Sequence, residues 1–123
     1  KLPVPPFQSP QDADAQVARA VNFYHRLFGA NPLGMWPGEG SVSEAAVSAF
    51  VKNGIKWVAT DQQVLQNSLG GSVPPFFQYQ PYMVDTDDVK GGGGTSDQKM
   101  AVFFRDTALS NKVGFTFQPL WGQ

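Results

Sequence analysis

Residues 31–61 constrain the fold more than any other stretch, because a loop, a helix and a strand follow one another there without interruption. The loop is rich in glycine and proline, and it presents a single carboxylate, Glu39, between Gly38 and Gly40. Loop, helix and strand in this order form one repeat of an α/β fold. In such folds the loops at the strand ends carry the chemistry, so Glu39 is the first candidate for a functional residue.

Local signals set the expected limits of the helix and the strand in this repeat. The segment Ser41-Val42-Ser43-Glu44 has the form of a capping box and predicts that the helix begins at Ser41. Gly54 predicts its end. Residues 55–60 are short, rich in β-formers and apolar on both faces except at Lys56, which indicates an interior strand of a parallel sheet. Asp61 then lies at the end of this strand.

The rest of the chain alternates between predicted helices and strands joined by loops, with no internal repeat. The elements expected are an amphipathic helix over residues 10–28, a short helix over 62–68 capped by Asp61, strands over 82–84 and 99–105, and a last short helix from Asp106 to about Gly114. Residues 1–10 hold four prolines and predict an extended lead-in over a neighbouring surface. The acidic, glycine-rich residues 85–98 are expected to form a flexible hairpin tip or insertion.

Charge and cysteine content argue against several classes of function. The net charge is −1 with nine Lys plus Arg and no basic run, which disfavours a nucleic-acid surface. No stretch is apolar enough to span a membrane, and the lack of cysteine leaves the compartment open.

We also expect no cofactor and no metal: His25 has no partner in the sequence and is expected to be an ordinary helix residue. Asp85, Asp87 and Asp88 lack the spacing of a calcium loop.

Three segments together resemble glycoside hydrolase family 57, which comprises retaining enzymes of the α-amylase, amylopullulanase and 4-α-glucanotransferase type. Residues 34–43, GMWPGEGSVS, resemble the family segment that carries the catalytic nucleophile. Residues 54–61, GIKWVATD, resemble the strand that follows it, and residues 102–106, VFFRD, resemble a later step from strand to helix. The similarity covers nearly the whole chain in order, and the first segment is its most specific part.

The resemblance implies a role for Glu39, and two further residues, Trp36 and Asp61, are candidates for substrate binding. Glu39 falls at the position of the nucleophile, where flanking glycines let a substrate approach and a helix beginning at Ser41 would favour an ionised carboxylate. Trp36 offers a flat apolar face suited to a sugar ring, although a tryptophan is more often a core residue. Asp61 is a second candidate for substrate binding, with helix capping as its alternative role. In the family a serine often precedes the nucleophile, whereas Gly38 stands here.

The resemblance also implies the fold, an incomplete (β/α)7 barrel with parallel strands and flanking helices. Several family features have no counterpart in these 123 residues, including the histidine-rich motif and the general acid aspartate. We therefore expect residues 1–123 to be a single segment, a central slice of a longer catalytic domain. Its partners would be an α-glucan or oligosaccharide and the remainder of the parent chain, and the slice alone would be inactive.

Two readings without catalysis remain open. In a carbohydrate-binding module, exposed aromatic residues would form a platform for sugars. The candidates for such a platform are Trp36, Phe76, Phe77, Tyr79, Tyr82 and Trp121. In a structural interaction module, the same residues would contact other subunits. Glu39 would then be an acid that stabilises a helix N-terminus, and Asp106, next to Arg105, would cap the helix that follows it.

Overall fold

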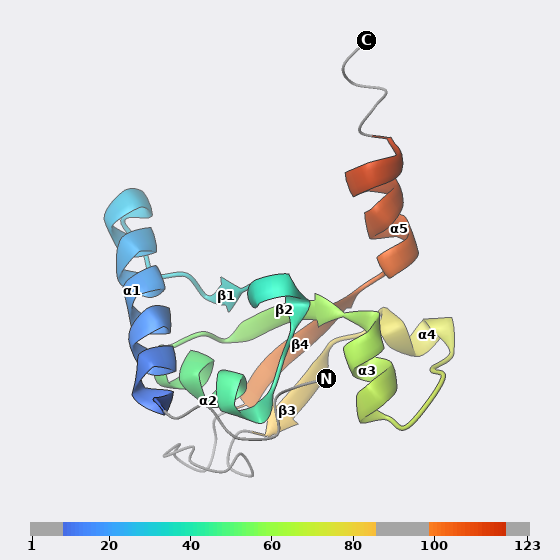
Figure 1. Cartoon of the computed structure of the whole chain (residues 1–123), viewed down its shortest axis with the longest axis horizontal. Coiled ribbons are helices and arrows are strands. Elements are labelled where there is room, and N and C mark those ends of the chain that lie inside the picture. Colours follow the sequence, from blue (N-terminus) through green and yellow to red (C-terminus); the bar gives the residue numbers. More distant parts are fainter. Residues whose placement is uncertain (1–8, 86–98, 118–123) are drawn as a thin grey trace.

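A computed structural model of the chain describes residues 9–85 and 99–117. Its centre is a four-stranded sheet with the strand order β1-β2-β4-β3 (Figure 1). The strands are β1 (Gly34–Met35), β2 (Trp57–Asp61), β3 (Tyr82–Asp85) and β4 (Lys99–Arg105). β1 and β4 both run parallel to β2, whereas β3 is antiparallel to β4. The expected fold class is therefore confirmed: a mixed α/β fold whose sheet is mostly parallel and is flanked by helices.

Helices and helical turns connect and flank these strands. They are α1 (Pro10–Phe28), the 3-10 turn η1 (Gly38–Gly40), α2 (Glu44–Lys52), α3 (Gln62–Ser68), α4 (Pro75–Gln78), α5 (Thr107–Asn111) and the π-helical turn η2 (Lys112–Thr116). Residues 1–8, 86–98 and 118–123 lie outside the described residues. The expected lead-in and the expected hairpin tip fall mainly in the first two of these segments.

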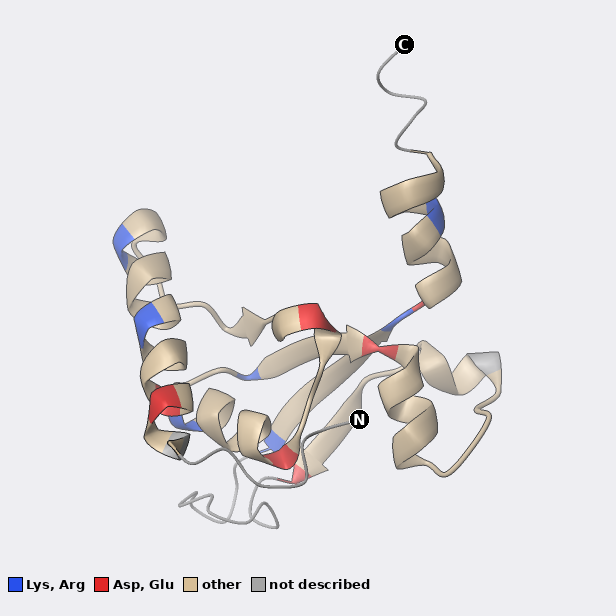
Figure 2. Cartoon of the chain, viewed as in Figure 1, with Lys and Arg blue, Asp and Glu red and all other residues tan. Residues whose placement is uncertain are grey.

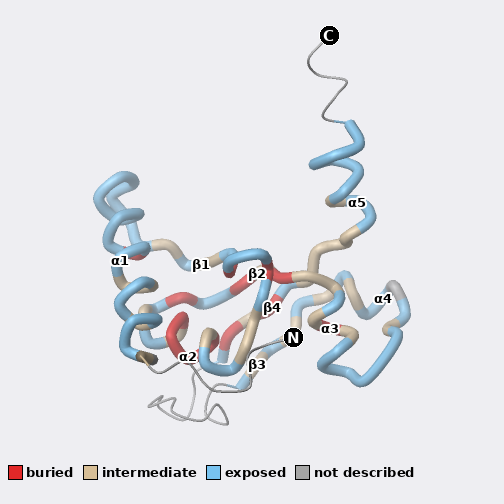
Figure 3. The backbone as a smooth tube through the Cα atoms, in the orientation of Figure 1, coloured by how far each residue is buried: buried red, intermediate tan, exposed pale blue. Residues whose placement is uncertain are grey.

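The core lies between the sheet and the helices that cover one of its faces. Val58 and Val102 are neighbours on β2 and β4, and both are buried. Phe50 of α2 and Val21 of α1 pack against them in the same cluster. Because side chains alternate along a strand, every second residue of β2 and β4 points into this cluster. Figure 3 shows the buried backbone concentrated along β2, β4 and α2.

The opposite face of the sheet is not covered by the described residues. Trp57 is 42% exposed, Phe103 43% and Met83 59%. The rings of Trp57 and Phe103 pack edge to face, with 6.0 Å between their centroids. The prediction of an interior strand of a parallel sheet after Gly54 is confirmed, with β2 at Trp57–Asp61 between β1 and β4. Within the described residues, only its helix-covered face is shielded.

The amphipathic helix over residues 10–28 is confirmed, with Gly29 ending it in the left-handed conformation at φ 73°. Its first half is held against α2, where Lys52 makes an ion pair with Asp14 at 3.3 Å. Its second half extends past the sheet, and Phe28 is 66% exposed. Of the apolar side chains described on this helix, only Val21 is buried, so most of its apolar stripe is not part of the core.

Two predicted helix limits were also wrong. The helix after the glycine-rich loop begins at Glu44, and its N-cap is Ser43, whose Oγ accepts a hydrogen bond from the Ala46 N–H at 3.3 Å. Ser41 is instead extended, because the chain must run from η1 at one edge of the sheet to the start of α2. Gly114 does not end the last helix, which continues from α5 into η2 as far as Thr116.

Candidate active site

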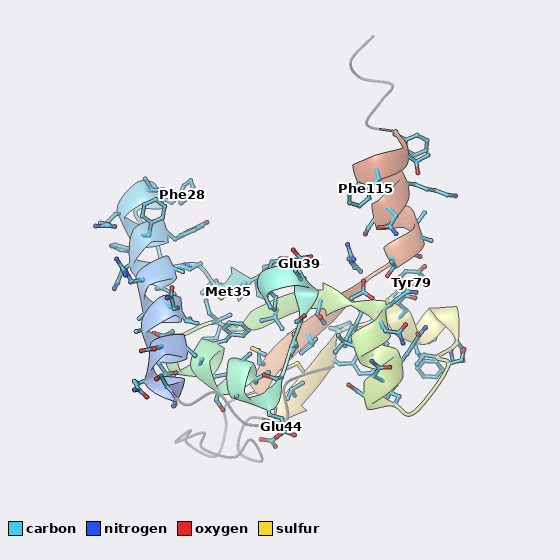
Figure 4. All side chains as sticks on the ribbon, in the orientation of Figure 1. Phe28, Met35, Glu39, Glu44, Tyr79 and Phe115 are labelled. Carbon is cyan, nitrogen blue, oxygen red and sulfur yellow. The ribbon has the colours of Figure 1, made fainter. Side chains whose placement is uncertain are left out.

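The candidate site lies where the parallel strands end. β1, β2 and β4 run in the same direction, so their carboxyl ends meet at one edge of the sheet. The turn η1 with Glu39 follows β1 at this edge, Asp61 ends β2 and Arg105 ends β4. In Figure 4 Glu39 lies on the upper edge, and Phe28 and Phe115 lie on projecting helical segments to either side. Loops at this edge are the usual place for a ligand site in α/β folds.

The backbone around Glu39 is a tight left-handed turn. Glu39 has φ 56° and ψ 18°, and among the described residues no other non-glycine residue has a positive φ. Such a conformation is unfavourable for a residue with a Cβ atom and is found where the surrounding structure imposes it. The Gly40 N–H donates to the Pro37 carbonyl at 2.9 Å, and the Ser41 N–H donates to the Gly38 carbonyl at 3.1 Å.

Gly40 joins this turn to the sheet beneath it. Its carbonyl accepts a hydrogen bond from the hydroxyl of Thr60, a fully buried residue of β2. A Cβ atom on Gly40, whose φ is 70°, would lie 3.3 Å from the ring of Trp36 and 3.8 Å from the Asp61 nitrogen. A glycine is therefore required here for two reasons, its backbone conformation and the close approach of its neighbours.

The carboxylate of Glu39 is exposed at this edge. Within residues 9–85 and 99–117 it accepts no hydrogen bond and makes no ion pair. The expectation that a helix beginning at Ser41 would stabilise its charge was wrong, because α2 begins only at Glu44. The helix-terminus reading of Glu39 loses its basis for the same reason.

Asp61, in contrast, has both carboxylate oxygens engaged. Oδ1 accepts from the Gln63 N–H at 2.9 Å and so caps α3, while Oδ2 accepts from Arg105 Nε at 2.8 Å and from Thr107 Oγ1 at 2.9 Å. Partial burial by itself raises the pKa of Asp61. The three hydrogen bonds and the charge of Arg105 outweigh this effect and hold the pKa below its ordinary value.

Trp36 borders the site above Arg105. The guanidinium carbon of Arg105 lies 5.7 Å from the centre of the Trp36 ring, a cation–π arrangement. Trp36 is 50% exposed, so it is not a core residue. The structure thus brings Glu39, Trp36 and Asp61 to one edge of the sheet.

Comparison with known families identifies the chain. The sequence model of glycosyl hydrolase family 57 matches residues 3–123, nearly the whole length. The chain belongs to this family. The resemblance seen in the three sequence segments is therefore confirmed.

A solved structure has the same fold as this family 57 chain. The crystal structure of 4-alpha-glucanotransferase from Thermococcus litoralis matches with a TM-score of 0.65 at 18% sequence identity. The match covers 86% of this chain and 15% of the glucanotransferase chain. The α/β sheet of the family 57 chain is thus similar to one part of a much larger family enzyme. No functionally curated protein matches the sequence.

A third carboxylate of the family 57 chain, that of Asp106, lies just beyond β4. Asp106 Oδ1 accepts from the Leu109 N–H at 2.8 Å and caps α5, as the sequence predicted, while its Oδ2 accepts from the hydroxyl of Tyr79 at 2.6 Å. The hydrogen bond from Tyr79 and the capping bond from Leu109 hold the pKa of Asp106 below its ordinary value. The hydrogen bond between Tyr79 and Asp106 also raises the pKa of Tyr79.

Sequence reasoning missed several residues that shape this edge. Thr60 of β2, Thr107 of α5 and Gln78 of α4 reach it from separate elements: Gln78 Nε2, for example, donates to the Arg105 carbonyl at 3.2 Å and to Gln62 Oε1 at 3.0 Å. Thr60 had one signal, since it is a polar residue in an otherwise apolar strand. No sequence signal indicated the other residues, because their hydrogen-bond partners are distant in the sequence.

The described part of the chain also bears on metals and membranes. Among residues 9–85 and 99–117, no three His, Asp or Glu side chains are grouped closely enough to hold a metal ion. None of the helices described is both long and apolar enough to cross a membrane. Lys and Arg are scattered over α1, α2, the residue before β2, β4 and η2 (Figure 2), without a continuous basic stripe on the part of the chain described.

Proposed function

We propose that this chain is the nucleophile-bearing part of a retaining, α-glucan-active glycoside hydrolase or transglycosylase, with Glu39 as the nucleophile. The observation that carries the proposal is the contrast between the carboxylates at the sheet edge. Those of Asp61 and Asp106 are fully engaged in capping and cross-strand hydrogen bonds. That of Glu39 is exposed and held on a left-handed turn at the edge where α/β enzymes bind substrates.

In a retaining mechanism the reaction takes two steps. A carboxylate oxygen attacks C1 of the sugar while an acid donates a proton to the leaving glycosidic oxygen, which gives a covalent glycosyl ester. Water, or a sugar hydroxyl in a transglycosylase, then attacks C1 and releases the carboxylate, while the former acid acts as the base. An exposed carboxylate between two glycines, as at Glu39, suits the first step because the sugar ring can approach its oxygen closely.

The general acid is proposed to lie outside this chain. A general acid needs a raised pKa so that it is protonated at neutral pH. The pKa of Asp61 and that of Asp106 are both lowered, and their oxygens already accept hydrogen bonds. A retaining pair also stands roughly 5–5.5 Å apart, so the acid must come from a segment that packs over this edge. The 123 residues alone are therefore expected to be inactive.

An α-glucan or oligosaccharide is the proposed substrate, and the remainder of a longer parent chain is the proposed partner. The chain belongs to a glycosyl hydrolase family, and the solved structure it resembles is a 4-alpha-glucanotransferase. Trp36 supports a sugar ligand because its half-exposed ring stands beside the Glu39 turn. Asp61 is better explained as the residue that holds Arg105 and α3 than as a direct substrate contact.

The test is made on the full-length protein with an α-glucan substrate. Glu39→Gln removes the nucleophile and should lower kcat by several orders of magnitude while leaving glucan binding nearly intact. Glu39→Ala should regain activity with azide, which replaces the missing nucleophile. An activated, fluorinated α-glucosyl fluoride should form an ester on the peptide that contains Glu39, detected by mass spectrometry.

Glu44→Gln is the matched control, because it makes the same change at an exposed position on the opposite side of the molecule (Figure 4). It should leave kcat unchanged. Full activity of Glu39→Gln would refute the assignment of the nucleophile. Glucan binding without turnover by the wild-type protein would instead favour the non-catalytic carbohydrate-binding module.

The aromatic residues beyond Trp36 offer limited support for that alternative. Tyr82 is committed to structure, since its hydroxyl donates to the Phe77 carbonyl at 2.8 Å and its ring packs on Phe104. Phe76 and Phe77 lie on α4 and contact each other edge to face at 5.8 Å. Trp121 lies outside the described residues. Phe76 and Tyr79 are nevertheless 76% and 62% exposed, so α4 and its C-cap keep the exposed rings that such a platform would need.

A further inference from the structure

Thr60 is a buried polar residue in the middle of the apolar core. It is fully buried in β2, one residue before the carboxyl end of the strand, and its neighbour across the sheet is Phe104. A hydroxyl in such a place loses its hydration on folding and needs a partner within the protein. The partner is the Gly40 carbonyl, which is 20 residues away in sequence and next to Glu39.

This hydrogen bond differs in kind from the other contacts of the Glu39 turn. The bonds from Gly40 N–H to Pro37 and from Ser41 N–H to Gly38 lie within the loop and fix its local shape. Trp36 packs against Gly40 from the same loop. Among the described residues, the Thr60 hydroxyl supplies the hydrogen bond that fixes the turn to the sheet. The height of Glu39 above the sheet therefore depends on Thr60.

Nucleophilic catalysis is sensitive to this kind of placement. The attacking oxygen and the sugar C1 must approach to within about 3–3.5 Å in line, and a displacement of 1 Å can lower the rate about 100-fold. The left-handed backbone of Glu39 is unfavourable in isolation. Without an external anchor, the turn would relax towards other conformations and move the carboxylate.

We propose that Thr60 is a positioning residue for the nucleophile: its hydroxyl holds the Gly40 carbonyl, and thereby the Glu39 turn, at the height that the attack on C1 requires. The proposal rests on the proposed function of Glu39. It assigns Thr60 no contact with the substrate.

Two substitutions in the full-length protein separate the hydroxyl from the shape of the side chain. Thr60→Val keeps the shape and removes the donor, so kcat should fall about 10- to 100-fold while KM changes less than about threefold. Thr60→Ser keeps the donor and should retain kcat within about threefold. The rate of ester formation with the fluorinated glucosyl fluoride should fall in parallel with kcat, because the defect lies in the attack itself.

Ser48→Ala is the matched control. Ser48 in α2 is also buried, but its hydroxyl has no hydrogen-bond partner among the described residues. Removing it deletes a buried hydroxyl from the same core without touching the turn, so kcat should not change. All variants are assayed well below their melting temperatures, so that a loss of stability alone leaves kcat unaffected.

The outcomes distinguish this inference from the proposed function. A wild-type kcat for folded Thr60→Val, with Glu39→Gln inactive, would overturn the role of Thr60 and leave the nucleophile in place. An active Glu39→Gln would overturn both. If Thr60→Val does not fold, the comparison of Thr60→Ala with Thr60→Ser decides, and equal kcat values for those two would refute the proposal.

Discussion

Arg105 Nε donates a hydrogen bond to Asp61 Oδ2 at 2.8 Å, although the two residues are 44 positions apart in the sequence. The register of the parallel strands places Asp61 of β2 directly opposite Arg105 of β4. The same carboxylate caps α3 through Gln63, and the same guanidinium lies over the ring of Trp36. One ion pair thus links β2, β4, α3 and the loop that carries Glu39.

Asp61→Ala should therefore destabilise the full-length protein by about 2 kcal/mol, because it removes a helix cap and two further hydrogen bonds to a charged group. Asp61→Asn keeps an oxygen that can cap α3 but loses the charge, so we expect about half of that loss. Urea unfolding monitored by circular dichroism measures both. Asp12→Ala, at an exposed site in α1, should cost less than about 0.5 kcal/mol. Equal stabilities of wild type and Asp61→Ala would contradict the role of the pair.

The pH dependence of stability follows from the lowered pKa values of Asp61 and Asp106. A carboxyl group whose pKa is lower in the folded than in the unfolded state stabilises the fold above its unfolded pKa, about 3.9. That contribution is lost as the pH falls through the folded value. The melting temperature should thus decrease below about pH 4, and less steeply in Asp61→Asn than in wild type. Identical pH profiles of the two proteins would show that Asp61 contributes nothing.

Glu39→Gly should stabilise the protein while abolishing activity. The left-handed φ of 56° at this position is unfavourable for glutamate and acceptable for glycine, so we expect a gain of about 0.5–1 kcal/mol in the free energy of unfolding. Glu44→Gly, in the first turn of α2, should instead destabilise by up to about 1 kcal/mol. Thermal unfolding compares the two. A loss of stability in Glu39→Gly would mean that the turn imposes no strain on Glu39.

Gly34→Ala should destabilise the short strand β1. A Cβ atom on Gly34 would lie 2.0 Å from Cε2 of Trp57, whose ring lies against the glycine on the neighbouring strand. Moving that ring should cost about 1–3 kcal/mol. In a Trp57→Ala background the same substitution should be nearly neutral, which a double-mutant cycle measures as a coupling energy. If Gly34→Ala lowered the free energy of unfolding by the same amount in that background, the destabilisation would not come from the contact with Trp57.

Trp36→Ala tests the proposed contact with the sugar. If the exposed face of the ring stacks on substrate, KM should rise about tenfold, and Trp36→Phe should restore most of the affinity. Steady-state kinetics on the full-length protein separates KM from kcat. A change in kcat alone would mean that Trp36 only supports Gly40 and the Glu39 turn.

Much of the fold could be predicted from local signals. Four predicted features are present as expected. They are the helix over residues 10–28, the strand at Asp61, the capping of α3 by Asp61 and the two strands on either side of residues 86–98. These predictions depended on caps, glycine stops and alternation, which act over three or four residues. The limits of two helices were wrong because Ser43 competed with Ser41 as N-cap and because Gly114 did not interrupt the helix.

The α/β class, the family and a single carboxylate between two glycines on a loop ahead of a helix follow from local patterns in the sequence. The strand β1 before that loop, the residues that hold the carboxylate and the covered face of the sheet are known from the folded structure alone. The pairs Thr60–Gly40, Arg105–Asp61 and Tyr79–Asp106 join elements that are distant in sequence. The Arg105–Asp61 pair depends on the register between β2 and β4, whereas the other two pairs require the loop of Glu39 and the end of α4 to pack against the sheet and the start of α5.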